Sequence, residues 1–360
     1  MEFMYNYAGL PKDCDLLMNI NSAANRLFNK LRDFNIEAQN ISEYNKNYFR
    51  IKLKSLKSVL QLNCYILSWA MAKSNVPLSG FVFLEYGGGS GMLSLLAKEL
   101  NIGIVIYNDI YDVSCADARV IGEGLGNQAD YYVHGDIDDV IRFSKNNSIF
   151  CNAIASYDVI EHIYDIEGFL SKLHLLSDGP LTVVMSSGAN NSNPLTRKHL
   201  MKKQLEVEYE DRGKKCGHKE RDSLRAYLKI REEIIQKYAG KLKENEVKQL
   251  ARATRGMIEF DIKRCVDTYQ KTRQWPKEPS HSTNTCDPYT GNWMEHLMDP
   301  YHLKDILSKE GFEVEILSGY YGHSKSMGKR VLGNLLNMAI YFLGRQRLLI
   351  APFFTLYGNK

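Results

Sequence analysis

The sequence predicts an α/β protein in which a doubly wound, mostly parallel sheet carries helices on both faces. Between residues 81 and 187, short apolar runs of strand-forming residues alternate with segments whose apolar positions follow helical spacing. Strands that alternate with helices form parallel sheets, and the helices then cover both faces. The first unit is an apolar run at 81–84 that leads through a turn into a helix at 92–100.

Four glycines lie in the turn between this strand and this helix: Gly87, Gly88, Gly89 and Gly91. Glycine lets the backbone approach a ligand closely, and the N-terminus of the following helix offers unpaired N–H groups to a carboxylate or phosphate. The dinucleotide fingerprint G-x-G-x-x-G would require a glycine at position 92, where the chain has Met92. The spacing that fits is an acid, Glu85, followed by glycines at 87, 89 and 91.

Polar residues follow the next three predicted strands. Asp109 ends the apolar run at 103–108, 18 residues after Gly91. A carboxylate at this position of a doubly wound sheet accepts hydrogen bonds from both hydroxyl groups of a ribose. Asp136 follows the third strand, and the fourth strand, at 153–157, leads into the segment Asp158-x-x-Glu161-His162. Because ligands bind at the carboxyl ends of the strands in such sheets, we expect these side chains to gather there.

This succession of strand, glycine turn, acid, acid and Glu-His pair over residues 81–187 resembles the class I S-adenosylmethionine-dependent methyltransferases, in particular bacterial O-methyltransferases. The resemblance implies a seven-stranded sheet whose antiparallel strand lies at 352–360, and S-adenosylmethionine as the cofactor. It also implies that Asp136 binds the adenine amino group, although the same residue type is common in ordinary loops. The implied cofactor contacts are Glu85, Gly87, Gly88, Gly89, Gly91, Asp109, Ile110, Asp136, Ile137 and Ser156.

The remaining residues are arranged around this S-adenosylmethionine-binding core at 81–187. Residues 1–80 form an N-terminal helical cap, and Tyr44 and Tyr48 in a loop between its helices either contact the cofactor or are solvated. Residues 188–300 form a helical insertion, which in methyltransferases serves as a lid over the acceptor. Residues 301–360 complete the sheet with a helix and two strands.

Composition limits the class of protein. With 360 residues, of which 44% are apolar and 24% charged, the chain is typical of soluble globular proteins. Residues 197–273 contain 22 Lys and Arg but 13 Asp and Glu, a balance of +9, whereas the whole chain carries only +4. The seven scattered cysteines form no C-x-x-C pair, and the N-terminus lacks a signal-peptide pattern, so we expect a reduced, cytoplasmic protein.

The predicted catalytic residues are His162, Glu161 and Asp158. His162 is the candidate general base, because an imidazole titrates near neutral pH; alternatively it only holds its loop in place. The D-x-x-E-H segment also resembles the metal-binding E-x-x-E-H of ubiquinone-biosynthesis O-methyltransferases and plant small-RNA methyltransferases. Asp158 replaces the first Glu and shortens that arm, and a divalent ion would need a further ligand from His296 or His302.

The acceptor residues are expected in the segment 285–296. Tyr289, Asn292, Trp293 and His296 combine aromatic faces with polar groups, which suits a sugar; alternatively, the segment is a surface loop with Trp293 in the core. The basic insertion favours an anionic acceptor. The first hypothesis is therefore O-methylation of an anionic, sugar-containing acceptor, such as a surface glycan or its nucleotide- or phosphate-linked precursor.

Two other functions remain open. The basic helices and the D-x-x-E-H segment fit a nucleic-acid (RNA) methyltransferase, although no RNA-binding signature is present. A methyltransferase-like binding protein without catalysis is the other possibility, which the intact glycines and acids disfavour.

The apolar segment at 331–343 also has two interpretations. It is too short to span a bilayer of about 30 Å, and it is either a buried or partner-facing helix or a basic amphipathic contact with the inner membrane through 331–349.

Overall fold

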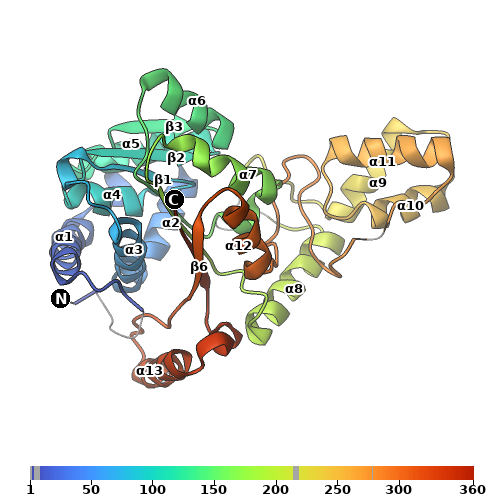
Figure 1. Cartoon of the computed structure of the whole chain (residues 1–360). Helices are drawn as coiled ribbons and strands as arrows, with labels where there is room; N and C mark the ends of the chain where they lie inside the picture. The colour runs from blue at the N-terminus through green and yellow to red at the C-terminus, as the bar shows by residue number, and fades with distance from the viewer. Residues whose placement is uncertain (1, 4–8, 214–218, 278) are drawn as a thin grey trace.

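The computed structural model describes residues 2–3, 9–213, 219–277 and 279–360 (Figure 1). Seven strands form one sheet in the order β3-β2-β1-β4-β5-β7-β6, and only β7 runs antiparallel to its neighbours. The predicted doubly wound, mostly parallel sheet is confirmed, including the antiparallel strand near the C-terminus. The strands are β1 (Val82–Glu85), β2 (Ile104–Asp109), β3 (Tyr131–His134), β4 (Ala153–Tyr157), β5 (Thr182–Ser187), β6 (Glu313–Ser318) and β7 (Phe354–Asn359).

Helices cover both faces of this sheet because successive strand residues point to opposite sides. In β1, Phe83 packs with the helices of one face, whereas the next residue, Leu84, packs with those of the other face. The first face is covered by α1 (Cys14–Asp33), α3 (Leu56–Met71), α4 (Met92–Glu99) and α5 (Asp112–Leu125). The second is covered by α6 (Ile137–Asn147), α7 (Ile166–Lys172) and α12 (Pro300–Lys309).

The N-terminal cap differs from the expectation in one respect. Tyr44 and Tyr48 lie on a helix, α2 (Glu43–Lys54), and not in a loop. Ser42 caps α2 through its hydroxyl oxygen, which accepts from the N–H of Asn45, and its own N–H donates to the Asp117 carboxylate on α5. Sequence spacing predicted a helix only from residue 49 onwards and missed the first half of α2, because α2 is largely polar and its stability comes from these tertiary contacts.

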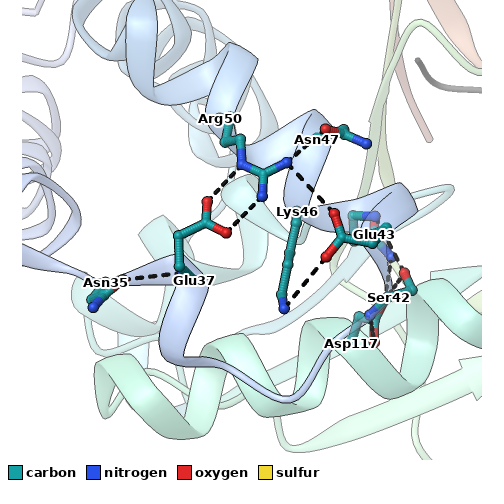
Figure 2. A network of polar contacts seen from close by, with 9 residues as sticks. Asn35, Glu37, Ser42, Glu43, Lys46, Asn47, Arg50 and Asp117 are labelled. Carbon is teal, nitrogen blue, oxygen red and sulfur yellow. Dashed lines mark hydrogen bonds and ion pairs between the residues drawn. The ribbon is translucent and has the colours of Figure 1, made fainter. Parts of the chain in front are cut away.

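A polar network holds the outer side of α2 (Figure 2). Arg50 donates to both carboxylate oxygens of Glu37, each at 2.6 Å, and Glu37 lies in the short helix η2 (Ile36–Ala38). Arg50 also donates to Asn47, and Glu43 lies 3.6 Å from the ammonium nitrogen of Lys46. Together with the bond to α5, these contacts fix which side chains of α2 face the strand ends.

The insertion consists of four helices with their own hydrophobic core: α8 (Pro194–Tyr209), α9 (Tyr227–Tyr238), α10 (Glu244–Ala253) and α11 (Glu259–Thr272). In Figure 1, α9, α10 and α11 project away from the sheet. A buried ion pair between Arg231 and Glu208 joins α9 to α8. The chain then returns to the core through an irregular segment that ends at α12.

The C-terminal segment contains α13 (Met327–Phe342) and the short helix η6 (Gly344–Leu349) before β7. Of the alternatives for 331–349, the buried helix is excluded for α13, because most of its apolar side chains are exposed, whereas the partner-facing helix and the membrane contact both stay open. None of the helices in the described part of the chain is both long and apolar enough to cross a membrane. Cys216 lies outside the described residues, and the six other cysteines are free thiols.

Candidate functional site

A cavity of about 740 Å³ lies at the carboxyl ends of β1, β2 and β4. Its wall is formed by the glycine turn, the ends of these strands, α2, and the segment that returns from the insertion. Cavities of this size hold small-molecule ligands or cofactors, and this position is the one where doubly wound sheets bind them.

The glycine turn leaves room for a ligand. Gly87, Gly89 and Gly91 all have positive φ, which side chains other than glycine tolerate poorly. Gly89 lines the cavity, and a Cβ built on it would meet no protein atom within 4 Å. Position 88 requires glycine for a different reason: a Cβ there would collide with the Tyr107 ring. The open space at Gly89 is therefore the part of the turn where a bound molecule can approach the backbone.

Glu85 supports the turn from behind and does not line the cavity. Its buried carboxylate accepts hydrogen bonds from the N–H groups of Leu93, at 3.3 Å, and Ser94, at 2.8 Å. Burial raises the pKa of Glu85, and these two hydrogen bonds oppose that shift. The expectation that the N-terminus of α4 offers unpaired N–H groups is therefore wrong for these two amides, because Glu85 already occupies them.

Asp109 and Asp136 both line the cavity, as expected for the two acids. The two carboxylate oxygens of Asp109 accept from the N–H groups of Gly89 and Tyr111, each at 2.8 Å. Asp109 is thus held next to the glycine turn, and each oxygen keeps a further lone pair for a hydroxyl donor. Asp136 caps α6 through one oxygen, which accepts from the N–H groups of Asp138 and Asp139.

The other implied cofactor contacts divide into two groups. Ile110 and Ile137 line the cavity and offer apolar surface beside the two acids. Ser156 does not line it, because its hydroxyl is buried and donates to the sulfur of Met185 at 2.8 Å.

Lys52 is a cavity residue that sequence reasoning missed. Its ammonium group donates to the hydroxyl oxygen of Ser90, in the glycine turn, at 2.7 Å. Burial lowers the pKa of Lys52, and the charges of Glu85, Asp158 and Asp109 raise it. The net shift of the Lys52 pKa is downward, and its amino group is a hydrogen-bond donor beside the turn. No motif marks it, because α2 is brought there by contacts distant in sequence.

Tyr44 and Tyr48 accompany Lys52 on the cavity side of α2. Tyr44 packs edge-on against Tyr111, with ring centroids 5.5 Å apart, and against Tyr48, at 5.2 Å. Both tyrosines line the cavity, and Tyr48 is also 38% exposed to solvent. Their position leaves open both alternatives from the sequence, contact with a ligand and solvation.

His162 lies in the short helix η4 (Ile160–His162) and lines the cavity. Its Nδ1 is 2.9 Å from the carbonyl oxygen of Trp293. Because a carbonyl oxygen only accepts, Nδ1 must carry the proton, so Nε2 is the nitrogen with a free lone pair in the neutral ring. A histidine oriented in this way can accept a proton from a group in the cavity.

Asp158 and Glu161 occupy different environments although they are three residues apart. Asp158 lines the cavity, has a φ of +53°, and accepts from the N–H of Gly188 at 2.9 Å. Glu161 is fully buried, and neither of its carboxylate oxygens has a hydrogen-bond partner among the described residues. Burial and the neighbouring charge of Asp158 raise the pKa of Glu161 well above its usual value. Burial therefore favours the protonated, uncharged form of Glu161.

No group of three His, Cys, Asp or Glu side chains in the described residues is arranged to hold a metal ion. His302 lies on α12, 3.0 Å from the Glu167 carboxylate, and does not line the cavity. His296 stacks on Trp293, with ring centroids 4.2 Å apart, and burial lowers its pKa to about 4. Neither histidine joins Asp158 and Glu161 in a common site.

Only one of the four expected acceptor residues reaches the cavity. Asn292 lines it and donates to the Asp222 carboxylate at 3.1 Å. Trp293 instead donates from Nε1 to the carbonyl oxygen of Tyr164, and Tyr289 is 55% exposed outside the cavity. Glu295, also in the expected acceptor segment, lines this end as well, together with Lys219 and Arg221, which the sequence did not single out.

The comparisons with known proteins concern the fold. No protein-family model matches the sequence, and no curated protein matches it. The plantazolicin methyltransferase BamL, solved with a triazolic desmethylPZN analog and SAH, matches 95% of this chain and 98% of its own, at 12% identity and a TM-score of 0.42. A SAM-dependent methyltransferase from Archaeoglobus fulgidus matches 87% of this chain and 99% of its own, at 16% identity and a TM-score of 0.38.

Another match is shorter: the chain covers 40% of SMU.776, which was solved with SAH, at 14% identity and a TM-score of 0.30. What the site does must be argued from its own geometry.

Proposed function

We propose that this chain is an S-adenosylmethionine-dependent methyltransferase. One observation carries the proposal: the open space at Gly89 and the buried Asp109 carboxylate lie on the same wall of one cavity, joined by a 2.8 Å hydrogen bond. A nucleoside whose ribose meets Asp109 would pass directly over the glycine turn. The positions of the glycines and the two acids that line this wall suit such a molecule, and Lys52 suits its carboxylate.

Different residues around the turn would bind different parts of the cofactor. Asp109 would accept from the ribose hydroxyls, and Asp136 would accept from the adenine amino group through the oxygen that does not cap α6. Ile110 and Ile137 would contact the flat faces of the base. Lys52 would pair with the carboxylate of the amino-acid part, because a cation beside Ser90 lies where the turn leaves space.

The bound cofactor would supply a methyl group on a positively charged sulfur, so the protein mainly has to align the acceptor with it. Alignment of this kind contributes about 7–11 kcal/mol to a reaction. A hydroxyl acceptor must also lose its proton as its oxygen attacks. His162 Nε2 would accept that proton, while the Trp293 carbonyl holds the ring by Nδ1. This arrangement supports O-methylation.

The acceptor end of the cavity supports a polar, anionic acceptor. Lys219 and Arg221 supply positive charge, and Asn292 and Glu295 supply hydrogen-bonding groups of the kind that bind sugar hydroxyls. We therefore propose a sugar-containing anion, such as a phosphorylated or nucleotide-linked glycan precursor. The six free thiols support a cytoplasmic location for this step.

The nucleic-acid alternative is weakened by how the insertion uses its charges. Arg225, Lys229, Arg231, Lys248, Lys263, Arg264 and Arg273 each lie within 4.0 Å of a carboxylate of the insertion. Many of the positive side chains that produce the balance of +9 are therefore paired with carboxylates within the fold. RNA binding that fell steeply with salt concentration would favour this alternative over a small acceptor.

The experiment that identifies the acceptor uses the purified full chain with cofactor carrying a labelled methyl group. Fractionated extracts are added, and the pool that becomes labelled is identified. We expect the label in an anionic glycan or glycan-precursor pool. Label in RNA would support the alternative, and no label in any pool together with no cofactor binding would contradict the enzyme assignment.

Once the acceptor is identified, His162→Ala tests whether His162 acts as the general base. We expect turnover to fall about 10²–10⁴-fold while cofactor affinity stays nearly the same, because general-base catalysis contributes that much. His302→Ala is the matched control, since His302 lies outside the cavity. Equal turnover in His162→Ala and the wild-type protein would exclude the base role.

A further inference from the structure

Helix α13 presents a continuous apolar surface to solvent. Seven of its apolar side chains are between 52% and 79% exposed: Met327, Val331, Leu332, Leu335, Met338, Tyr341 and Phe342. Positions 327, 331, 335, 338 and 342 repeat every three or four residues and therefore form one stripe along the helix. Scattered exposed apolar residues are ordinary, but a stripe along sixteen residues marks a contact surface.

The opposite side of α13 fixes this orientation. Gly333, Asn337 and Ile340 are buried against the body of the protein. The Asn337 side chain accepts from the N–H of Tyr321 at 2.7 Å and donates to the carbonyl oxygen of Tyr321 at 3.0 Å. Because the helix is held by these two hydrogen bonds and by the packing of Ile340, the apolar stripe cannot turn inward without breaking these contacts.

The charged residues of the segment that carries the stripe all have one sign. Residues 316–360 contain six Lys and Arg and no Asp or Glu. Lys325, Lys329 and Arg330 are exposed where α13 begins. Lys57 of α3 and Arg330 both act on His323, whose pKa is lowered first by burial and then by these two charges. Positive charge therefore gathers at the N-terminal end of the apolar stripe.

We infer that α13 lies in the surface of an anionic lipid bilayer, with its apolar stripe among the acyl chains and Lys325, Lys329 and Arg330 at the headgroups. The helix is about 24 Å long, which suits a position flat in the interface and not across it. A second copy of the chain fits less well, because the segment offers no carboxylate to meet these cations. This surface is independent of the proposed methyl transfer.

The test measures cosedimentation of the purified full chain with vesicles. One set contains equal parts of phosphatidylcholine and phosphatidylglycerol, and the other contains phosphatidylcholine only. We expect binding to the anionic vesicles that weakens as salt is raised. Phe342→Ser with Leu335→Ser should remove binding, and Lys329→Glu with Arg330→Glu should weaken it more than tenfold, because each Lys or Arg near such a surface contributes about 1 kcal/mol.

Matched controls come from the insertion. Leu195→Ser changes a side chain that is 80% exposed on α8, and Lys237→Glu with Lys271→Glu changes two exposed lysines on α9 and α11. These variants should bind vesicles like the wild-type protein, and the unfolding midpoints of all variants should agree. Equal binding to both vesicle types, no binding to either, or a dimer that Phe342→Ser with Leu335→Ser dissociates without any vesicle binding would overturn the inference.

Discussion

The two ends of the cavity, the one at which we propose that the cofactor binds (the cofactor end) and the one at which we propose that the acceptor binds (the acceptor end), are built in different ways. At the cofactor end, Asp109 is the last residue of β2, Asp136 lies just beyond the end of β3, and Gly89 lies in the turn that follows β1. At the acceptor end, Lys219, Arg221 and Asn292 come from irregular segments around the insertion. The first set is positioned by backbone hydrogen bonds of the sheet, and the second by side-chain contacts between elements distant in sequence.

This difference explains which residues face the ligand. A strand end fixes the direction of the next one or two residues, so an acid there reaches the cavity almost irrespective of the rest of the chain. A residue in a long returning segment reaches it only if its neighbours pack elsewhere. Trp293 packs on His296 and Tyr164, and this stacking brings Asn292 to the cavity wall.

The largest expected effect falls on the cofactor end. Gly89→Val should lower the affinity for S-adenosylmethionine at least ~100-fold, because its side chain fills the ligand space and the positive φ is strained. Isothermal titration calorimetry measures this. Gly126→Val is the matched control: Gly126 also has a positive φ and open space, but it ends α5 outside the cavity. An equal loss of affinity in Gly89→Val and Gly126→Val would show that the loss does not come from filling the ligand space at Gly89.

A smaller effect is expected where the cap helix meets the glycine turn. Lys52→Met should weaken cofactor binding about 10–100-fold, because hydrogen bonds to charged groups contribute about 1.5–3 kcal/mol. Lys46→Met is the control on the same helix, since Lys46 pairs with Glu43 and lies outside the cavity. If Lys52→Met binds the cofactor as well as Lys46→Met does, the cap contributes no charge to the site.

Glu161 lies where the two ends join, because its carbonyl oxygen accepts from the N–H of His296. Its pKa is raised in the folded protein, so its contribution to stability is complete below about pH 4.5 and is lost as pH rises towards the folded pKa. Glu161→Gln should therefore reduce the fall in unfolding free energy between pH 5 and pH 8, because a glutamine side chain does not ionise.

Urea unfolding at the two pH values measures this effect. Glu313→Gln, on the exposed side of β6, is the control and should leave the fall unchanged. The same fall in Glu161→Gln as in the wild-type protein would mean that Glu161 is ionised when folded.

The smallest effect is expected at the acceptor end. Asn292→Ala should raise the acceptor KM about fivefold, because a neutral hydrogen bond contributes about 1 kcal/mol. Tyr289→Ala should leave KM unchanged, since Tyr289 lies outside the cavity. A larger effect of Tyr289→Ala would show that the acceptor extends beyond the cavity wall.

The sequence was sufficient for the sheet and for most of the cofactor end. Alternating apolar runs predicted the strands, and the glycine spacing predicted the turn, because both depend on neighbours in the chain. Glu85 shows the limit of this reasoning. Its position in the motif was evident, but its contact is with the N–H groups of α4 behind the turn.

Tertiary contacts decided what the sequence did not. Lys52 faces the cavity because α2 is bound to Asp117 and Glu37, and no local pattern encodes that placement. In the C-terminal segment the sequence predicted the element but not its orientation. Its apolar spacing predicted a helix, but only the buried Asn337 and Ile340 show which side faces the protein.

The most direct test of the central claim is a titration of the purified chain with S-adenosylmethionine and, separately, with NADH. We expect S-adenosylmethionine to bind at one site, and Asp109→Asn to weaken that binding about tenfold, because Asp109 then loses its charge towards the ribose hydroxyls. We expect no binding of NADH, because the turn lacks the third glycine of a dinucleotide site. Binding of NADH that depends on Asp109, or S-adenosylmethionine binding that Asp109→Asn leaves unchanged, would contradict it.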